Sequence, residues 1–433
     1  MRVLRILLIN PKSSNVDHLP IPPLGILYLA AYIRENGFPD LSVIDNNREN
    51  RSMDVLETAI SQADIVGLTG TTSQYNQARE IATLAEKYHI KRVMGGPHAS
   101  FLWQEILEKG EMDAVVFGEG ELSFLEILRA ISTGKPLVGI AGVGVRTDNG
   151  TAVMGAPRSL VSNLDILPIP ARDLVPVVDY PVRELKRFDG SYTHMMSSRG
   201  CSGKCYFCSS PFMWGTPRFR SAEKTFAEML AIYQLYRISN IHFQDDAFTS
   251  ARARLHKLCE LITDSGINFK WSCQARPDHV DRELLLHMRL AGCVQVEFGV
   301  ESADERITQA VQKGYTKVQV EQAFRWAYEV GLNAYGFFIV GLPGETLSSW
   351  VRSILFARSL KMVNSRWSVL VPFPGTRVFK EKLVEIVDTD FLNWRLKHPV
   401  IKSGHFGPKT LGLMRTIADK LCNGLRDVGT YKA

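Results

Sequence analysis

The sequence predicts an α/β protein in which a Rossmann-like, doubly wound parallel sheet is followed by a second run of six strand–helix units. Two observations predict this class. Short apolar runs alternate with stretches of helical periodicity over residues 1–138, and the same alternation restarts at residue 191. Because parallel strands need crossover helices between them, this alternation indicates parallel sheets with right-handed connections. The chain of 433 residues is long enough for two domains with ordinary cores.

Residues 1–138 are expected to form the Rossmann-like domain. Its strands are expected at 3–9, 41–45, 65–69, 92–95 and 114–117, with helices over 25–36 and 53–62 and after each later strand. Ligands of such folds bind at the carboxyl ends of the strands. The loops there, at 67–73, 95–98 and 118–121, are small and polar, and their glycines allow a ligand to approach the backbone.

Residues 139–190 are expected to connect the two domains without contributing chemistry. Two apolar runs, at 140–146 and 152–155, flank an Asn-Gly pair at 149–150, which is a strong hairpin signal. The proline-rich stretch at 164–173 then predicts an extended linker.

The second domain is expected to span residues 191–376. Its six strands are expected at 194–198, 241–244, 269–274, 294–299, 334–340 and 366–370, with helices at 222–236, 251–265, 281–291, 317–330 and 347–360. Its chemistry is expected at the carboxyl ends of the strands. Residues 377–433 are expected to form a helical and irregular tail, with a helix over 378–387.

Composition limits the class of protein. The net charge of +6 is small for this length and does not indicate a nucleic-acid partner. No run of 18 apolar residues is present, and the apolar start of the chain lacks a cleavage site and is expected to be a first strand. Seven cysteines, an odd number, argue against a disulfide framework and for a reducing compartment. We therefore expect a cytoplasmic protein with no membrane or nucleic-acid partner.

Three cysteines lie within eight residues, Cys201, Cys205 and Cys208, in the spacing C-x3-C-x2-C. Thiolate sulfur is the preferred ligand of iron–sulfur clusters, and three thiolates at this spacing can wrap one corner of a cubane. No fourth cysteine lies close by, so one iron would stay open to a chelating substrate or cofactor. The alternatives are a zinc knuckle and ordinary core cysteines. Zinc usually needs a fourth Cys or His near a second cysteine pair, and none follows.

This loop, after the first strand of the second domain and with an aromatic residue before its last cysteine, resembles the signature of the radical SAM superfamily. The resemblance implies a partial (βα)6 barrel and a [4Fe–4S] cluster held by the three cysteines. It also implies that the open iron chelates S-adenosylmethionine (SAM), whose reductive cleavage yields methionine and a 5′-deoxyadenosyl radical. An electron donor such as flavodoxin or ferredoxin, or a dedicated reductase, is then expected as a partner.

The same resemblance implies SAM-binding residues at the strand ends. Phe207 would lie against the adenine, and Glu301, in a Gly-x-Glu-Ser phrase, would accept the ribose hydroxyls. The alternative for Glu301 is a structural role. Gly341 belongs to the adenine-side motif, in which Glu345 is expected to cap the next helix.

Three further residues follow the second and third strands of the second domain. Asp245 and Asp246 would pair with the amino group of SAM, or else be solvated or capping carboxylates. Arg276 would clamp the SAM carboxylate, or equally form an interdomain ion pair. Each of these motifs is weak alone, whereas their correct order and spacing together are strong support.

The first domain resembles the cobalamin-binding domain that precedes the barrel in one radical SAM branch, through phrases at 22–31, 95–98 and 118–121. The resemblance implies cobalamin contacts from loop residues, namely Gly70, Thr71, Ser73, Gly95, Gly96, Gly118, Glu119 and Gly120. The D-x-H-x-x-G motif that supplies a lower axial histidine in other cobalamin proteins is lacking. His18 and His98, the histidines near these loops, are expected to be polar loop residues. The alternative is a domain kept as a scaffold without cobalamin.

The sequence therefore predicts a radical SAM enzyme, a cobalamin-dependent C-methyltransferase acting on a small molecule. The alternative is a cobalamin-independent dehydration, deoxygenation or rearrangement of a small molecule such as an amino sugar. A third hypothesis, a non-catalytic sensor, is disfavoured by the complete series of SAM motifs. No motif identifies the substrate or a catalytic acid or base.

Overall fold

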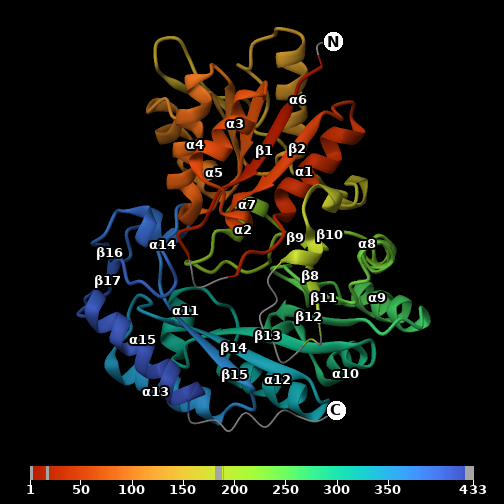
Figure 1. Ribbon diagram of the computed structural model, residues 1–433. Helices are drawn as coiled ribbons and strands as arrows, with labels where there is room; N and C mark the ends of the chain where they lie inside the picture. The colour runs from red at the N-terminus through yellow and green to blue at the C-terminus, as the bar shows by residue number, and fades with distance from the viewer. Residues whose placement is uncertain (1–2, 16–18, 181–187, 189, 425–433) are drawn as a thin grey trace. The chain divides into compact units, whose positions relative to one another are not determined.

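The computed structural model describes residues 3–15, 19–180, 188 and 190–424 (Figure 1). The chain divides into two compact units, Met1–Pro181 and Val182–Ala433. Within the described residues, no helix is both long enough and apolar enough to cross a membrane.

The first unit is built on a seven-stranded sheet in the order β2-β1-β3-β4-β5-β6-β7. Five strands are parallel, and they confirm the five predicted strands: β1 (Ile6–Asn10), β2 (Leu41–Asp45), β3 (Ile65–Leu68), β4 (Lys91–Met94) and β5 (Ala114–Val116). The strand order reverses between β1 and β3. Ligands of doubly wound sheets bind beyond the carboxyl ends of the strands at such a reversal.

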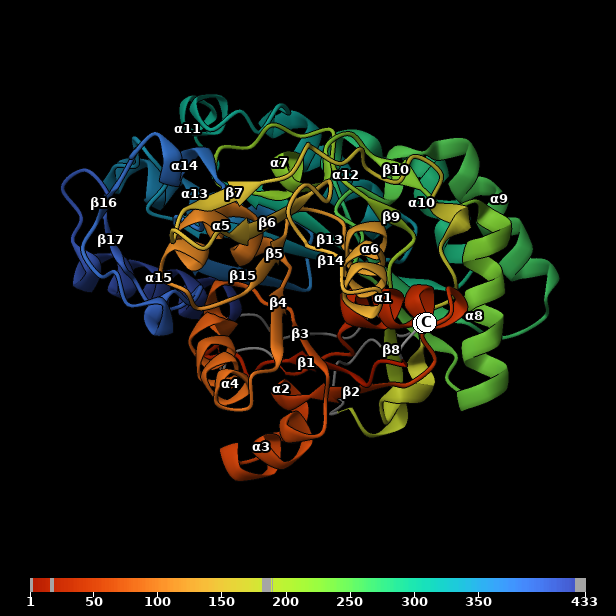
Figure 2. The same cartoon turned by 90° about the horizontal axis from the view of Figure 1, so that it is seen from above.

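Helices cover both faces of this sheet (Figures 1 and 2). On one face α1 (Leu24–Glu35) and α6 (Glu121–Ser132) contact each other, and on the other α3 (Met53–Ser61) contacts α4 (Tyr75–Lys87). A short helix, α2 (Asn46–Glu49), follows β2, and α5 (Pro97–Glu108) packs against β5 and the strands beyond it.

The hairpin after the parallel strands is part of the same sheet. Its strands, β6 (Val143–Arg146) and β7 (Ala152–Met154), continue the sheet antiparallel to β5. The proline-rich stretch that follows is held on this unit by an ion pair and a hydrogen bond. Arg34 donates to both carboxylate oxygens of Asp173, at 2.7 and 3.1 Å, and the Tyr180 hydroxyl donates to Asp45 at 2.5 Å.

The second unit holds six parallel strands in the order β15-β14-β13-β12-β11-β8. They confirm the six predicted strands: β8 (Tyr192–Met195), β11 (Asn240–Phe243), β12 (Lys270–Ala275), β13 (Cys293–Glu301), β14 (Asn333–Val340) and β15 (Asn364–Val369). The five predicted helices are also present: α8 (Ala222–Tyr236), α9 (Arg252–Asp264), α10 (Arg282–Leu290), α12 (Lys317–Glu329) and α13 (Leu347–Ser359). The fold class is therefore confirmed.

Short elements between the repeats shape the carboxyl edge of this sheet. A two-stranded ribbon, β9 (Ser198–Arg199) with β10 (Arg218–Phe219), brackets α7 (Ser210–Trp214). A second short helix, α11 (Glu305–Ala310), follows β13. None of these elements is long enough to give a periodic signal in the sequence.

The helix expected over 378–387 is wrong. Helix α14 (Arg377–Lys380) stops after one turn, and Lys382 adopts a φ of +52°, which no α-helix continues. The chain then forms β16 (Glu385–Ile386), paired with β17 (Ile401–Lys402).

The tail also contains a helix that the sequence analysis missed, α15 (Pro408–Asn423). It packs against β15 and α13. Asn423 at its end accepts from the Ser365 N–H at 2.9 Å and donates to the Ser365 carbonyl at 2.8 Å. The tail thus satisfies backbone groups at the edge strand of the sheet.

Candidate functional site

The three cysteines lie on a loop that follows β9, with Cys205 buried and Cys201 and Cys208 partly exposed. Gly203 lies between the first two, and its N–H donates to the Cys201 sulfur at 3.4 Å. A side-chain carbon at Gly203 would lie 3.5 Å from the Cys201 sulfur and 3.6 Å from the Cys205 sulfur. The two sulfurs therefore face the same side of the loop, at a place that glycine leaves open.

Burial and geometry around the cysteines fit a cluster. Burial raises the pKa of Cys205 and raises the pKa of Cys208 to about 12, so these thiols would stay protonated without a metal. Bound iron deprotonates its thiol ligands. Within the described residues, no three His, Cys, Asp or Glu side chains converge to hold a single metal ion. A cubane spreads its cysteine ligands over separate irons, so its ligands do not need to converge on one ion.

Hydrogen bonds fix the cysteine loop on both sides. The Tyr206 N–H donates to the Val311 carbonyl at the end of α11 at 3.1 Å, and the Tyr206 carbonyl accepts from the Val378 N–H of α14 at 3.0 Å. The Arg377 guanidinium lies over the Tyr206 ring, 3.6 Å from its centre. These contacts order the loop before any cluster is loaded.

Glu301 lies at the end of β13 in a strained backbone conformation. Its φ is +65°, and the Ser302 N–H donates to the Val300 carbonyl across it at 2.8 Å. This is the rare form of the γ-turn, and holding a non-glycine residue there costs about 1–3 kcal/mol. Such strain persists only where the surrounding structure fixes it, which is typical of functional sites.

Lys313 is a site residue that the sequence analysis missed. Its ammonium donates to Glu301 Oε1 at 2.6 Å, and both side chains are buried. The same ammonium lies 5.4 Å from the centres of the Phe207 and Tyr315 rings. Burial alone would lower the pKa of Lys313, but the negative charge of Glu301 beside it raises the pKa well above its ordinary value. Lys313 therefore stays charged and links Phe207 of the cysteine loop to the end of β13.

Arg276 follows β12 and lies against the cysteine loop. A side-chain carbon at Gly203 would come within 2.8 Å of Arg276 Nη1. The other nitrogens are engaged locally, with Nε and Nη2 3.0 and 2.9 Å from the Asp278 carboxylate and Nη2 3.2 Å from the Lys313 carbonyl. The guanidinium thus pairs within its own loop and turns Nη1 toward the cysteines.

The structure separates the two aspartates that follow β11. Asp245 is 1% exposed, and its oxygens accept from the Ser197 N–H at 3.1 Å and from the hydroxyls of Ser197 and Ser198. Asp246 is exposed and accepts from the Ser210 hydroxyl at 2.5 Å. Asp245 thus ties β11 to the segment before the cysteine loop, whereas Asp246 is accessible to a ligand.

Gly341 and Glu345 form a closed turn at the end of β14. The Gly341 N–H donates to Glu345 Oε2 at 2.5 Å, and burial raises the pKa of Glu345 to about 7. The expectation that Glu345 caps α13 is wrong. Thr346 is the cap instead, with its hydroxyl accepting from the Ser349 N–H at 3.1 Å. Threonine takes this place because its side chain reaches the third helical N–H.

In the first unit, the glycine loops after β3 and β4 are in contact. A side-chain carbon at Gly96 would lie 2.9 Å from the Gly70 nitrogen and 3.0 Å from its carbonyl oxygen, and Gly96 has a φ of +93°. Only glycine fits this approach. Thr71 and Ser73 beside it carry hydroxyls 3.1 Å apart. Gly95 leads into Gly96 at the end of β4, so five of the eight predicted cobalamin residues lie together at this edge.

The loop after β5 is arranged differently. Gly118 donates its N–H to the Ser100 hydroxyl at 3.0 Å and has a φ of +72°. Glu119 is buried, and its Oε2 accepts from the Val161 N–H at 2.6 Å. Gly120 directly precedes α6. The carboxylate of Glu119 therefore holds the segment just before the proline-rich stretch, whereas open space lies beside Gly118.

His98 is a core residue. It lies in the first turn of α5, is 1% exposed, and packs its ring on Tyr75 with 4.1 Å between ring centres. Its Nδ1 lies 3.1 Å from the Thr72 hydroxyl. Burial lowers the pKa of His98 to about 3. The expectation of a polar loop residue is corrected, because the ring packs inside the unit. His18 lies outside the described residues.

Comparison with known proteins decides the family. A profile of the radical SAM superfamily matches residues 195–357, and a profile of the B12 binding domain matches residues 16–128. An uncharacterised methyltransferase of Pyrococcus horikoshii is 34% identical over 94% of this chain and 89% of its own length. The chain belongs to the radical SAM superfamily.

One further sequence relative and one solved structure match most of this radical SAM protein. The anaerobic magnesium-protoporphyrin IX monomethyl ester cyclase of Rubrivivax gelatinosus is 25% identical over 88% of this chain and 70% of its own length. The structure of the radical SAM methyltransferase TsrM from Kitasatospora setae, with cobalamin and a [4Fe–4S] cluster bound, superposes with a TM-score of 0.73 at 21% identity, covering 87% of this chain and 74% of that one. The predicted superfamily and its cobalamin branch are confirmed. The predicted cofactors, a [4Fe–4S] cluster, SAM and cobalamin, are those of the two matched families.

Proposed function

We propose that this radical SAM protein is a cobalamin-dependent methyltransferase that acts on a small molecule. The observation that carries the proposal is that one chain combines a fixed three-cysteine loop with a unit of the B12-binding family. The methyltransferase among its relatives supports methyl transfer over a radical reaction without cobalamin.

The chain itself would bind, orient and shield the cofactors. When bound, the cluster supplies an electron, SAM a reactive adenosyl group, and cobalamin a methyl carrier. Cys201, Cys205 and Cys208 would hold the cluster, since their loop is ordered and two of their sulfurs face one side. Tyr206, pinned between α11 and α14, would keep that loop from moving as the cluster changes charge.

SAM would lie among the residues that surround the cysteine loop. Glu301 would accept the ribose hydroxyls and Phe207 would lie against the adenine; Lys313 contacts both residues. The carboxylate of SAM would meet the cations of Lys313 and of Arg276, whose Nη1 faces the cysteines. Asp246 rather than Asp245 would receive the amino group, because Asp245 is buried and committed to Ser197 and Ser198.

Gly341 would contact the adenine through its carbonyl, since Glu345 takes its N–H. Cobalamin would contact the loops after β3, β4 and β5, through Gly70, Thr71, Ser73, Gly95, Gly96, Gly118 and Gly120, whereas the carboxylate of Glu119 is held by Val161. His98 would supply no axial ligand, because its ring is enclosed between Tyr75 and Thr72. An electron donor of the flavodoxin or ferredoxin type would reduce the cluster.

Methyl-labelled SAM tests the proposal. Reduced, anaerobic protein loaded with cluster and cobalamin is expected to move the label from SAM to the bound cobalamin and to release S-adenosylhomocysteine. The variant Cys205→Ala is expected to lose 5′-deoxyadenosine formation while still binding cobalamin. If wild-type protein forms 5′-deoxyadenosine but puts no label on cobalamin, methyl transfer is refuted, and the dehydration or rearrangement reaction becomes the better account.

A further inference from the structure

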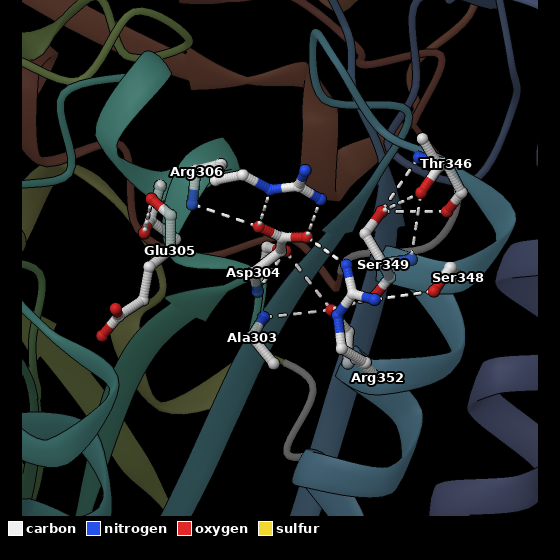
Figure 3. A network of polar contacts seen from close by, with 11 residues as sticks. Ala303, Asp304, Glu305, Arg306, Thr346, Ser348, Ser349 and Arg352 are labelled. Carbon is white, nitrogen blue, oxygen red and sulfur yellow. Dashed lines mark hydrogen bonds and ion pairs between the residues drawn. The ribbon is translucent and has the colours of Figure 1, made fainter.

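A network of polar contacts centred on Asp304 follows Glu301 by three residues (Figure 3). The Asp304 carboxylate, 5% exposed, accepts from Arg306 Nη2 at 3.0 Å and from Arg352 of α13. The side chains of Arg306 and Arg352 are 80% and 46% exposed. Two guanidiniums at the surface therefore converge on one buried carboxylate directly after the strained turn.

Serine hydroxyls tie the same turn to α13. The Ser353 hydroxyl accepts from the Ala303 N–H at 3.0 Å and lies 3.3 Å from the Ser302 hydroxyl. The Ser302 hydroxyl accepts in turn from the Asp304 N–H at 3.2 Å. The segment that leaves Glu301 is thus bound to one turn of α13, side by side with Arg352 (Figure 3).

The two arginines contribute differently to this link. Arg306 is only two residues from Asp304, and its N–H and guanidinium both reach the same carboxylate, so it ties together no separate elements. Arg352 comes from α13, where its Nη1 also donates to the Ser348 hydroxyl at 2.6 Å. The hydrogen bonds from Arg306 and Arg352 hold the pKa of Asp304 well below its ordinary value, so the carboxylate remains charged. Arg352 is therefore the ionic connection between α13 and the turn.

We infer that Arg352 is a positioning residue for Glu301, acting through Asp304, and so governs recognition of the ribose of SAM. The inference rests on the proposed function, in which Glu301 accepts the ribose hydroxyls. Lys313 fixes the carboxylate of Glu301, and the link to α13 fixes the backbone that follows it. A residue with φ of +65° returns to the extended region once its neighbours are released, which turns its side chain away.

Two ligands that differ in one ribose hydroxyl test the inference, S-adenosylhomocysteine and its 2′-deoxy form. Their dissociation constants are measured by equilibrium binding to the full-length, cluster-loaded protein under anaerobic conditions. A hydrogen bond to a carboxylate predicts that wild-type protein favours the ribose form about tenfold. Arg352→Met is expected to bring this ratio close to one, and Arg352→Lys to restore most of it. Arg306→Met is the matched control and is expected to keep the wild-type ratio.

The ratio of the two dissociation constants separates a positioning role of Arg352 from a general effect on the stability of the fold. A general loss of folded protein lowers both affinities alike and leaves the ratio unchanged, so an unchanged ratio in Arg352→Met overturns the inference. Glu301→Gln separates this failure from failure of the proposed function. If Glu301→Gln lowers the ratio and Arg352→Met does not, only the positioning role is lost. If Glu301→Gln keeps the wild-type ratio, the ribose role of Glu301 is wrong and the inference falls with it.

Discussion

Lys313 and Glu301 form a buried ion pair, with 2.6 Å between Nζ and Oε1, where β13 ends beside the cysteine loop. Each charge is expensive to bury alone, so each partner offsets the charge of the other and holds it in place. The strained turn at Glu301 brings the pair together, and Phe207 links it to the cysteines. The proposed site thus rests on a contact between two strand-end loops rather than on the cysteines alone.

Lys313→Met is expected to lower the free energy of unfolding by about 3–5 kcal/mol, because it leaves Glu301 charged, buried and unpaired. Glu301→Gln in the same chain is expected to recover most of that loss. Urea unfolding of the two single variants and the double variant measures the coupling. Simple addition of the two single losses in the double variant would show that the pair does not act as a unit.

The assignment of the three cysteines as cluster ligands predicts the iron content of their variants. Cys201→Ala, Cys205→Ala and Cys208→Ala are each expected to retain much less than the about four irons of a cubane after anaerobic reconstitution. Cys273→Ala is the control, because Cys273 is fully buried in β12 and is expected to leave the iron content unchanged. Iron analysis with the absorption spectrum provides the measurement. Full iron content in Cys205→Ala would contradict the assigned ligand set.

The two aspartates after β11 are predicted to differ. Asp246→Asn is expected to weaken SAM binding about tenfold while leaving the melting temperature unchanged, because Asp246 is exposed and accepts a single side-chain hydrogen bond, from Ser210, within the described residues. Asp245→Asn is expected to leave SAM affinity unchanged and to destabilise the fold by about 1–3 kcal/mol, because it disturbs the buried hydrogen bonds from Ser197 and Ser198. SAM titration and thermal unfolding separate the two effects. Equal loss of affinity in both variants would contradict this division.

The burial of His98 predicts that the free energy of unfolding depends on pH. Burial lowers its pKa to about 3, below the value of about 6.5 in an unfolded chain. Between these values the unfolded state binds more protons, so the stability that neutral His98 provides is complete above about pH 6.5 and is lost as the pH falls. From about pH 7.5 to about pH 5 the loss should reach about 2 kcal/mol, and His98→Phe should remove it. Urea unfolding at both pH values measures it; the same pH slope in the variant would show that another group is responsible.

The fold could be predicted from the sequence where the signal is local. Parallel strands buried on both faces, such as β1 and β3, read as short apolar runs. Strand β14, in which buried and half-buried residues alternate, was found as well. The hairpin at residues 143–154 was also found, from its Asn-Gly turn. The tail was harder, because the apolar spacing over 378–387 fits a helix, and the left-handed Lys382 that stops it has no sequence signature.

The site could be predicted only in part. Cysteine spacing and the Gly-x-Glu-Ser phrase are contiguous in sequence, and they led to Cys205 and Glu301. Lys313 lies in a turn between α11 and α12 with no periodicity, and only the fold brings it to Glu301. Adjacent Asp245 and Asp246 look equivalent in sequence, but they point to opposite sides of the chain, one into the core and one to the surface.

Metal analysis of one preparation tests the central claim most directly. Full-length protein is reconstituted anaerobically with iron and sulfide, offered hydroxocobalamin, desalted, and analysed for iron and cobalt together with its absorption spectrum. The account predicts about four irons and about one cobalt per chain, with corrin bands retained after desalting. About four irons with no retained cobalt would contradict it, because the first unit would then be a scaffold and methyl transfer through cobalamin would have no carrier.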